Sequence, residues 1–262
     1  MLQSGLSMTV NLRALSRSIV YVPKHRPPDL KDFETLKEFL TKYNKILILT
    51  GAGISTESGI PDYRSEEVGL YARSNHKPIQ YQDFVKYPKV RQRLHHKAGS
   101  KNVIELHGTG YIVKCLNCPY EVSRTELQEK LLRDNLDMEN NFGMIRPDGD
   151  VDLTKEQESR FRSPLCPKCE GPLKPDIVFF GDNVPKLRVE VVRNEVSSSE
   201  AVFVLGSSLT VYSSYRIILQ AKEENKCVAI LNIGPTRADN IADIKIATKC
   251  GDLLPELCST IL

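Results

Sequence analysis

Three short segments made only of apolar residues constrain the fold of this chain more than any other feature. They are Ile46–Leu49 before Thr50-Gly51-Ala52-Gly53, Ala201–Leu205 before Gly206-Ser207-Ser208, and Val228–Leu231 before Asn232-Ile233-Gly234. Strands with no polar alternation are buried on both faces, which is typical of a parallel sheet covered by helices. With a helix expected over Tyr212–Glu224, this order predicts an α/β fold, a Rossmann-like doubly wound parallel sheet.

The turns that follow these segments predict a ligand site. In an open parallel sheet, ligands bind outside the carboxyl ends of the strands. Glycines there let the backbone approach a pyrophosphate, and Asn232 is suited to hold ribose hydroxyls. The spacing Gly51-x-Gly53, with the next glycine at Gly59, departs from the usual G-x-G-x-x-G, so for any one turn the alternative is a tight strand–helix connection. Three such turns at one edge favour a dinucleotide.

The seven cysteines include two Cys-x-x-Cys pairs, Cys115 with Cys118 and Cys166 with Cys169. In a reducing compartment, four thiolates at this spacing are the ligand set of a tetrahedral structural Zn²⁺. The alternative is a redox-active pair, but neither pair stands at the strand–helix junction of a thioredoxin-like motif. Because a closed four-thiolate site leaves no coordination position for a substrate, we expect this zinc to stabilise a small inserted module.

Positive charge is concentrated at the N-terminus. Residues 1–28 contain Arg13, Arg17, Lys24 and Arg26 and no acid, so the remaining residues sum to about −1 within the net charge of +3. This composition predicts a mitochondrial transit peptide and a location in the matrix; the alternative is an unstructured terminus with chance arginine content. The near-neutral remainder argues against a nucleic-acid binder, and no apolar run reaches the roughly 18 residues of a membrane-spanning helix.

The segment Gly51–Arg64, GAGISTESGIPDYR, resembles the signature of the sirtuins, a family of NAD-dependent protein deacylases. Tyr63 replaces the phenylalanine that is usual in this signature. The resemblance implies a loop that closes over NAD, with an arginine contacting the cofactor and an aromatic ring keeping water from the reactive ribose carbon. The NAD-binding residues that it implies are Gly51, Ala52, Gly53, Pro61, Asp62, Tyr63, Arg64, Gly206, Ser207, Ser208, Asn232, Ile233, Gly234 and Cys250.

One histidine, His107 in the sequence ELHG, is the candidate general base. From the residues alone, such a histidine is more often a structural hydrogen-bonding residue. The resemblance favours catalysis, because sirtuins place at this point the histidine that takes a proton from a ribose hydroxyl. In that family nicotinamide leaves, and the ribose oxygen then takes up the acyl group of the substrate lysine.

The segment Lys174–Asp182, KPDIVFFGD, predicts a short strand that ends in a glycine turn. A plain core strand is the alternative. In sirtuins the matching stretch pairs with the substrate peptide as an added strand and lines the acyl-lysine channel. The resemblance therefore implies that Val178, Phe180 and Gly181 bind the substrate, while Asp182 replaces the more common glutamate.

One departure from the sirtuin pattern concerns the residues before Leu94. Sirtuins have a Thr-Gln-Asn-x-Asp segment immediately before Leu-His-x-x-Ala-Gly, whereas here Leu94-His95-His96-Lys97-Ala98-Gly99 follows Val90–Arg93. Several tens of residues, including a strand and the Gln-Asn-x-Asp group that holds nicotinamide, are missing. A misplaced ribose carbon costs about 10²-fold in rate. The alternative function is therefore a catalytically impaired form that acts as a non-enzymatic scaffold.

The resemblance predicts an NAD-dependent protein-lysine deacylase of the mitochondrial class II branch, a branch associated with deacetylase, lipoamidase and ADP-ribosyltransferase activity. The expected cofactors are NAD and Zn²⁺, and the expected partners are acyl-lysine proteins, above all mitochondrial metabolic enzymes. Three parts are predicted: a targeting leader over 1–28, a Rossmann-like NAD-binding domain over 29–110 and 176–262, and an inserted four-cysteine zinc module over 111–175.

Overall fold

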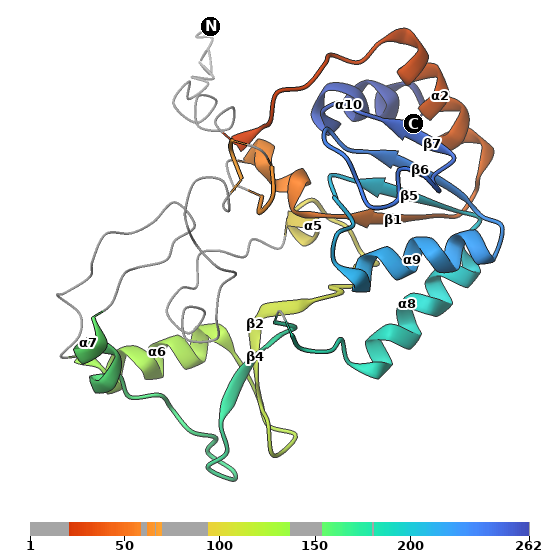
Figure 1. Ribbon diagram of the computed structural model, residues 1–262. Coiled ribbons are helices and arrows are strands. Elements are labelled where there is room, and N and C mark those ends of the chain that lie inside the picture. The colour runs from red at the N-terminus through yellow and green to blue at the C-terminus, as the bar shows by residue number, and fades with distance from the viewer. Residues whose placement is uncertain are drawn as a thin grey trace, which may run out of the picture. The chain divides into compact units, whose positions relative to one another are not determined.

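The computed structural model describes residues 21–58, 62–65, 67–69, 94–136, 154–179 and 181–261. These residues divide into two compact units (Figure 1). The first unit holds the described residues of Met1–Asn75 and Arg193–Leu262, and the second holds those of His76–Val192. The domain limits expected from the sequence, at 110/111 and 175/176, stay a prediction. No helix within the described ranges is both long and apolar enough to cross a membrane.

A four-stranded parallel sheet forms the centre of the first unit, in the order β1-β5-β6-β7. Its strands are β1 (Ile46–Thr50), β5 (Ala201–Leu205), β6 (Cys227–Leu231) and β7 (Ile244–Ile246). The three strands expected from the apolar segments are all present, paired in parallel and without a register shift. The prediction of a Rossmann-like parallel α/β fold is therefore confirmed.

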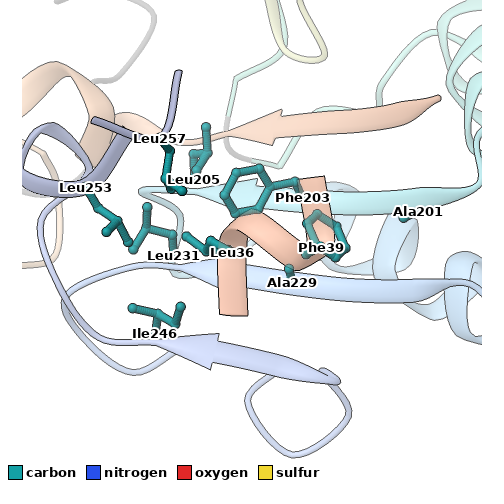
Figure 2. Packing of buried hydrophobic residues seen from close by; sticks show 10 residues of the cluster. All are labelled: Leu36, Phe39, Ala201, Phe203, Leu205, Ala229, Leu231, Ile246, Leu253 and Leu257. Atoms are coloured by element: carbon teal, nitrogen blue, oxygen red, sulfur yellow. The ribbon is translucent and has the colours of Figure 1, made fainter. Parts of the chain in front are cut away.

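Successive residues of β5 point to opposite sides of the sheet. Because all of them are apolar, both faces of the sheet need a covering layer, and helices provide it. One face is covered by α2 (Leu30–Lys42) and α10 (Cys250–Ile261). On this face, Phe203 and other residues of β5, β6 and β7 form one apolar cluster with the two helices (Figure 2). On the other side lies α9 (Tyr212–Glu223), which packs on β5 and β6. The final turns of α8 (Lys186–Ser198) also belong to this unit.

Helix α2 begins where its polar residues dictate. Asp29 caps the helix by accepting from the backbone N–H of Asp32, and Asp32 accepts in return from the N–H of Asp29. This reciprocal pair satisfies two backbone donors that the first turn leaves without helical partners. Further along, Phe39 packs on Phe203 with ring centroids 5.6 Å apart. The helix is thus fixed at its start by polar contacts and along its length by apolar burial.

Strand β1 is the outermost strand of the sheet among the described residues, and it differs from β5 in burial. Ile48 pairs in register with Phe203, yet 55% of Ile48 is exposed and only 2% of Phe203. The expectation that this first strand is buried on both faces is therefore wrong at Ile48. The reason is its edge position, which the composition of a five-residue strand does not reveal.

The second unit contains a three-stranded antiparallel sheet in the order β3-β2-β4. Its strands are β2 (Gly108–Cys115), β3 (Glu121–Ser123) and β4 (Leu173–Ile177). The helices of this unit are α5 (Leu94–Lys97), α6 (Arg124–Asp134), α7 (Lys155–Arg160) and the first turns of α8. Ser123 caps α6 by accepting from the N–H of Glu126. Strand β4 covers the first half of the strand expected over Lys174–Asp182.

Candidate active site

The four cysteines of the two Cys-x-x-Cys pairs come together in the second unit. Their sulfur atoms all lie within 4.8 Å of one another. The Sγ atoms of Cys115 and Cys169 are 3.5 Å apart, and those of Cys118 and Cys166 are 3.6 Å apart. A tetrahedral Zn²⁺ with Zn–S bonds of about 2.3 Å separates its sulfurs by about 3.8 Å. The sulfur positions therefore fit a tetrahedral Zn²⁺.

The backbone around these sulfurs is arranged to hold an anionic ligand set. The N–H of Asn117 points at the Sγ of Cys115 at 3.3 Å. Burial raises the pKa of Cys115, but this N–H, that of Cys118 and the neighbouring thiols outweigh it and lower the pKa to about 7. Glu170 turns the second loop with a positive φ of 56°. A backbone N–H favours the thiolate of Cys169, but the neighbouring thiols outweigh it and raise the pKa of Cys169 to about 12, so a bound metal would have to displace protons from the cluster.

In the first unit, the turns after β1 and β5 lie against each other at the carboxyl edge of the sheet. Gly51 donates its N–H to the carbonyl of Leu205 at 3.0 Å, and Gly53 donates to the carbonyl of Gly206 at 2.8 Å. A Cβ added at Gly51 would stand 2.6 Å from the Gly206 oxygen. Because real Cβ atoms do not approach an oxygen so closely, only glycine fits there.

Only glycine fits at position 206, for two reasons. Its φ of 56° lies in the left-handed region, and a Cβ there would stand 2.6 Å from the N–H nitrogen of Ile54. Ser207 and Ser208 follow directly, and Ala52 begins the short 3₁₀ helix Ala52–Ser58. The glycines thus let the turns after β1 and β5 pack directly against each other.

The turn after β6 completes this edge of the sheet. Gly206 donates to the carbonyl of Leu231, and Asn232 donates its backbone N–H to Ile246. The Asn232 side chain donates to the carbonyl of Gly234 at 2.8 Å, so the amide is oriented across the turn that contains Ile233. The predicted NAD-binding turns of β1, β5 and β6 therefore do meet at one edge of one sheet.

Cys250 reaches the same edge from the start of α10. Its thiol lies 3.8 Å from the carbonyl of Leu231. Burial, with a smaller effect from the nearby charge of Glu57, raises the pKa of Cys250 to about 12. Glu57 accepts from the N–H of Gly251 at 2.9 Å and lies 3.7 Å from Lys249. Glu57 lies inside the signature GAGISTESGIPDYR, but its sequence position alone does not reveal this contact with the start of α10.

Of the rest of that signature, the structure describes residues 62–64. Asp62 accepts from the backbone N–H of Ser65 at 3.1 Å and also binds the Ser65 hydroxyl. This contact closes the turn that carries Tyr63 and Arg64, both of which have interactions of their own. Pro61 lies outside the described residues. Asp62 therefore fixes the backbone turn on which Tyr63 and Arg64 stand.

His107 belongs to the second unit, immediately before β2. Its carbonyl accepts from the N–H of Val178 at 2.9 Å, which ties it to the end of β4. Surrounding protein lowers the pKa of His107, and the positive charge of Arg188 lowers it further. The side chain still keeps an exposed face, so water screens part of both effects. A lowered pKa leaves the imidazole uncharged near neutral pH, as a proton acceptor requires.

The predicted substrate segment follows β4. Val178 is described and lies next to the main chain of His107. Gly181 adopts a φ of 87°, which confirms the expected glycine turn, and Phe180 lies outside the described residues. Asp182 accepts from Lys174 at 2.8 Å, and this contact lowers the pKa of Asp182. Lys174 of β4 thus holds the segment that follows this strand.

Comparisons with known proteins agree with this geometry. A family model described as "Sir2 family" matches residues 51–93 and 91–213. A Drosophila melanogaster protein, "NAD-dependent protein deacylase Sirt4", is 46% identical over 292 residues, covering 95% of this chain and 94% of the relative. The Homo sapiens protein "NAD-dependent protein lipoamidase sirtuin-4, mitochondrial" is 42% identical over 279 residues, covering 90% and 89%.

Solved structures give the same result. The chain of "Structural Basis for the Mechanism and Regulation of Sir2 Enzymes" superimposes with a TM-score of 0.63 and 25% identity, covering 87% of this chain and 97% of that one. "Structure of Sir2Tm bound to a propionylated peptide" gives a TM-score of 0.58 and 26% identity, with the same coverage. Fold and site define a Rossmann-like α/β protein with a four-cysteine centre. The chain belongs to the Sir2 family, which confirms the resemblance to the sirtuins.

The comparisons also locate a gap. The alignment with the Drosophila relative is 292 positions long, but 95% of 262 residues is about 249, so about 43 positions have no counterpart in this chain. The family model matches in two parts that meet at residues 91–93. This position agrees with the missing segment expected before Leu94.

Proposed function

We propose that this chain is an NAD-dependent protein-lysine deacylase that transfers the acyl group to ADP-ribose and releases nicotinamide. The observation that carries the proposal is the close approach of the turns at Gly51–Gly53 and Gly206, where no Cβ fits. The glycines let the two turns pack backbone against backbone at the carboxyl edge of the sheet, which is where main-chain N–H groups bind a diphosphate in folds of this class. Membership of the Sir2 family supports the same cofactor.

The roles of the first unit's residues follow from their positions. Backbone N–H groups after Gly51 and Gly206 would bind the NAD diphosphate, and Asn232 would bind ribose hydroxyls. Asp62 would hold Arg64 and Tyr63 toward the cofactor. NAD itself supplies an ADP-ribose acceptor whose bond to nicotinamide breaks during the reaction. The further cofactor contacts that we propose are Ala52, Gly53, Pro61, Ser207, Ser208, Ile233, Gly234 and Cys250.

His107 would act as the general base in the second unit. Its imidazole would take a proton from a ribose hydroxyl, which makes that oxygen a better acceptor for the acyl group. One water molecule is consumed: the bond between the acyl carbon and the lysine nitrogen breaks, the amine leaves with a proton, and the water oxygen stays with the acylated ADP-ribose. Zn²⁺ held by the four cysteines would stabilise the sheet that carries His107, without contacting the substrate. General-base catalysis of this kind contributes about 10²- to 10⁴-fold in rate.

The substrates that we propose are acyl-lysine side chains of proteins. The extended backbone at Val178, Phe180 and Gly181 would pair with the substrate peptide, so affinity would come mainly from main-chain hydrogen bonds and sequence preference would be loose. The names of the relatives, deacylase and lipoamidase, support larger acyl groups such as lipoyl. An ADP-ribosyltransferase side activity belongs to the same proposal.

The location that we propose is the mitochondrial matrix, with metabolic enzymes there as partners. Mammalian relatives from Bos taurus and Homo sapiens are named as mitochondrial. The acid-free, arginine-containing residues 1–28 support the same location. Mass spectrometry of matrix proteins after depletion of this chain would then show increased acylation of lysines.

Nicotinamide release from NAD tests the function directly. Purified protein is incubated with NAD and an acetylated or lipoylated peptide, and a His107→Asn variant is compared with a His96→Asn variant. His96 is an exposed histidine outside the proposed site, so it controls for the loss of an imidazole. We expect His107→Asn to lose at least about 10²-fold and His96→Asn to match the wild type. Equal rates for all three proteins would contradict the proposal.

The gap of about 43 positions favours one second candidate, a catalytically impaired scaffold. It predicts no turnover and no increase in melting temperature with NAD, because a protein that binds no cofactor gains no stability from it. A rise in melting temperature without turnover would separate lost chemistry from lost binding.

A further inference from the structure

A charged cluster in the second unit lies where β2, β4 and α8 meet. Asp176 of β4 accepts from Nη2 of Arg188 at 3.1 Å and 3.4 Å through its two oxygens, and Lys114 of β2 lies 3.4 Å from the same carboxylate. The side chains of Arg188 and Asp176 are only 20% and 18% exposed. Lys114 also lies 3.0 Å from Glu121 of β3, so two cations and two carboxylates form one charge-balanced cluster.

The other terminal nitrogen of Arg188 is not used by this ion pair. Nη1 is buried and, within the described part of the chain, has no hydrogen-bond partner. Leaving such a donor without a partner costs about 1–3 kcal/mol. It lies 3.2 Å from the position that a Cβ on Gly108 would occupy. The guanidinium is thus held by Asp176 through Nη2, while Nη1 lies on the side of Gly108.

Gly108 is the residue that follows His107, and its surroundings leave no freedom for a side chain. Its φ is 77°, and a Cβ would stand 1.9 Å from the carbonyl oxygen of Asp176. The carbonyl of His107 accepts from Val178 on the same segment. Arg188 and β4 therefore enclose the backbone that carries His107, and the charge of Arg188 lies beside it.

We propose that Arg188 is a positioning residue for His107: held by Asp176, it fixes the His107–Gly108 backbone against β4 and places a positive charge beside the imidazole. The inference rests on the proposed function in assigning His107 as the base. The charged groups on the elements around His107 are Glu105, Lys114 of β2, Glu121 of β3, Lys174 and Asp176 of β4, and Lys186, Arg188 and Glu190 of α8. Of these, Lys174 is paired with Asp182 at 2.8 Å, and Arg188 is the one whose charge acts on the imidazole.

The chemical consequence is that the His107 imidazole stays unprotonated, and so able to accept a proton, at neutral and mildly acidic pH. Burial by the surrounding protein already lowers the pKa of His107, and the charge of Arg188 opposes protonation further. Without Arg188, a larger fraction of the imidazole would be protonated on the acid side of neutrality and could not accept a proton. The ion pair with Asp176 holds the guanidinium in place beside the His107–Gly108 backbone.

A proton NMR titration of the full chain tests this without requiring turnover. The ring C–H signal of His107, assigned by its loss in His107→Asn, is followed from pH 4.5 to pH 8.5 in wild type, Arg188→Gln, Arg188→Lys and Arg193→Gln. Arg193 is an exposed arginine further along α8 and is the matched control. We expect the midpoint of His107 to rise in Arg188→Gln, to stay near the wild type in Arg188→Lys, and to stay unchanged in Arg193→Gln.

Three results would overturn the inference: an unchanged midpoint in Arg188→Gln, an equal rise in Arg193→Gln, or an equal rise in Arg188→Lys. If Arg188→Gln fails to fold, Arg188→Met gives the same test, since it keeps a long side chain at this position and removes the charge. In the deacylation assay, the loss of kcat/KM in Arg188→Gln should be about two- to tenfold larger at pH 6 than at pH 8.5, because one unit of pKa is a factor of ten. A shifted midpoint with no deacylation in any variant would refute the proposed function and leave the placement of Arg188 standing.

Discussion

The two sheets of this protein are held together by different physical means. The parallel sheet of the first unit has strands with fully buried residues, and ten residues form one apolar cluster with the helices on that face. In the antiparallel sheet of the second unit, β3 has no buried residue and β2 alternates between buried and partly exposed positions. What the second sheet has instead is four sulfur atoms within 4.8 Å. The first unit resembles a self-sufficient domain core, whereas the second needs an added link.

This difference also separates the candidate functions. The first unit offers backbone groups at strand ends, which need a rigid sheet beneath them to stay in place. The second unit offers His107, whose position depends on β2 and β4 staying paired. Loss of metal should therefore affect the base before it affects the cofactor turns.

The largest expected effect is from removing Zn²⁺ or one of its ligands. Structural zinc contributes about 10–16 kcal/mol of binding energy in small modules, so Cys118→Ser should unfold the second sheet. Hydrogen exchange should show loss of protection in β2 and β4, while β5 and β6 stay protected. Cys258→Ser, which changes an exposed cysteine outside the cluster, is the control. Equal loss of protection in both units would show that the two sheets are not independent in this respect.

A core substitution should produce the opposite pattern. Phe203→Ala removes a ring that is 2% exposed and should cost about 3–5 kcal/mol. Its partner in the ladder, Ile48, is 55% exposed, so Ile48→Ala should cost about 1 kcal/mol or less. Hydrogen exchange of β6 amides in increasing urea measures both changes within the first unit. A similar cost for the two variants would mean that the edge of β1 is covered in solution.

The glycines at the strand ends predict the next largest effect. Gly206→Ala adds a methyl group at a φ of 56° and within 2.6 Å of the Ile54 nitrogen, and should cost about 3 kcal/mol and abolish NAD binding. Gly99 has a φ of 82° with no atom within 4 Å of its added Cβ, so Gly99→Ala should cost only about 1–2 kcal/mol of backbone strain. Calorimetry with NAD and urea unfolding measure the two quantities. Tight NAD binding by Gly206→Ala would contradict the assignment of this turn.

The sequence specified most of the first unit because its signals are local. Apolar runs ending in glycine identify parallel strands, and Cys-x-x-Cys pairs identify metal ligands whatever the distance between them. Two things could not be read from it. The edge position of β1 depends on which strands are present elsewhere, so Ile48 looks like a core residue until the sheet order is known. The ion pair of Asp176 and Arg188 depends on how α8 packs on β4, and neither residue lies in a recognisable motif.

The smallest expected effect is on the stability of the first unit at the start of α2, and it depends on pH. The hydrogen bonds from Arg26 hold the pKa of the Asp32 carboxyl below its ordinary value, against the opposing effect of burial. A group whose pKa is lowered in the folded state stabilises that state above its ordinary pKa, near 4, and the stabilisation is lost as pH falls through the folded value. Asp32→Asn should therefore cost about 1–2 kcal/mol at pH 7 and almost nothing in strong acid.

The measurement is the difference in unfolding free energy between wild type and Asp32→Asn across the acid range, followed through the β6 amides. Arg26→Gln should show the same loss at pH 7, and the double variant should lose little more, because the two residues share one interaction. Metal ligands in the second unit must also be deprotonated to bind, so its sheet should weaken in acid even in the variants. A pH-independent cost for Asp32→Asn would mean that its helix cap, rather than its charge, holds α2 in place.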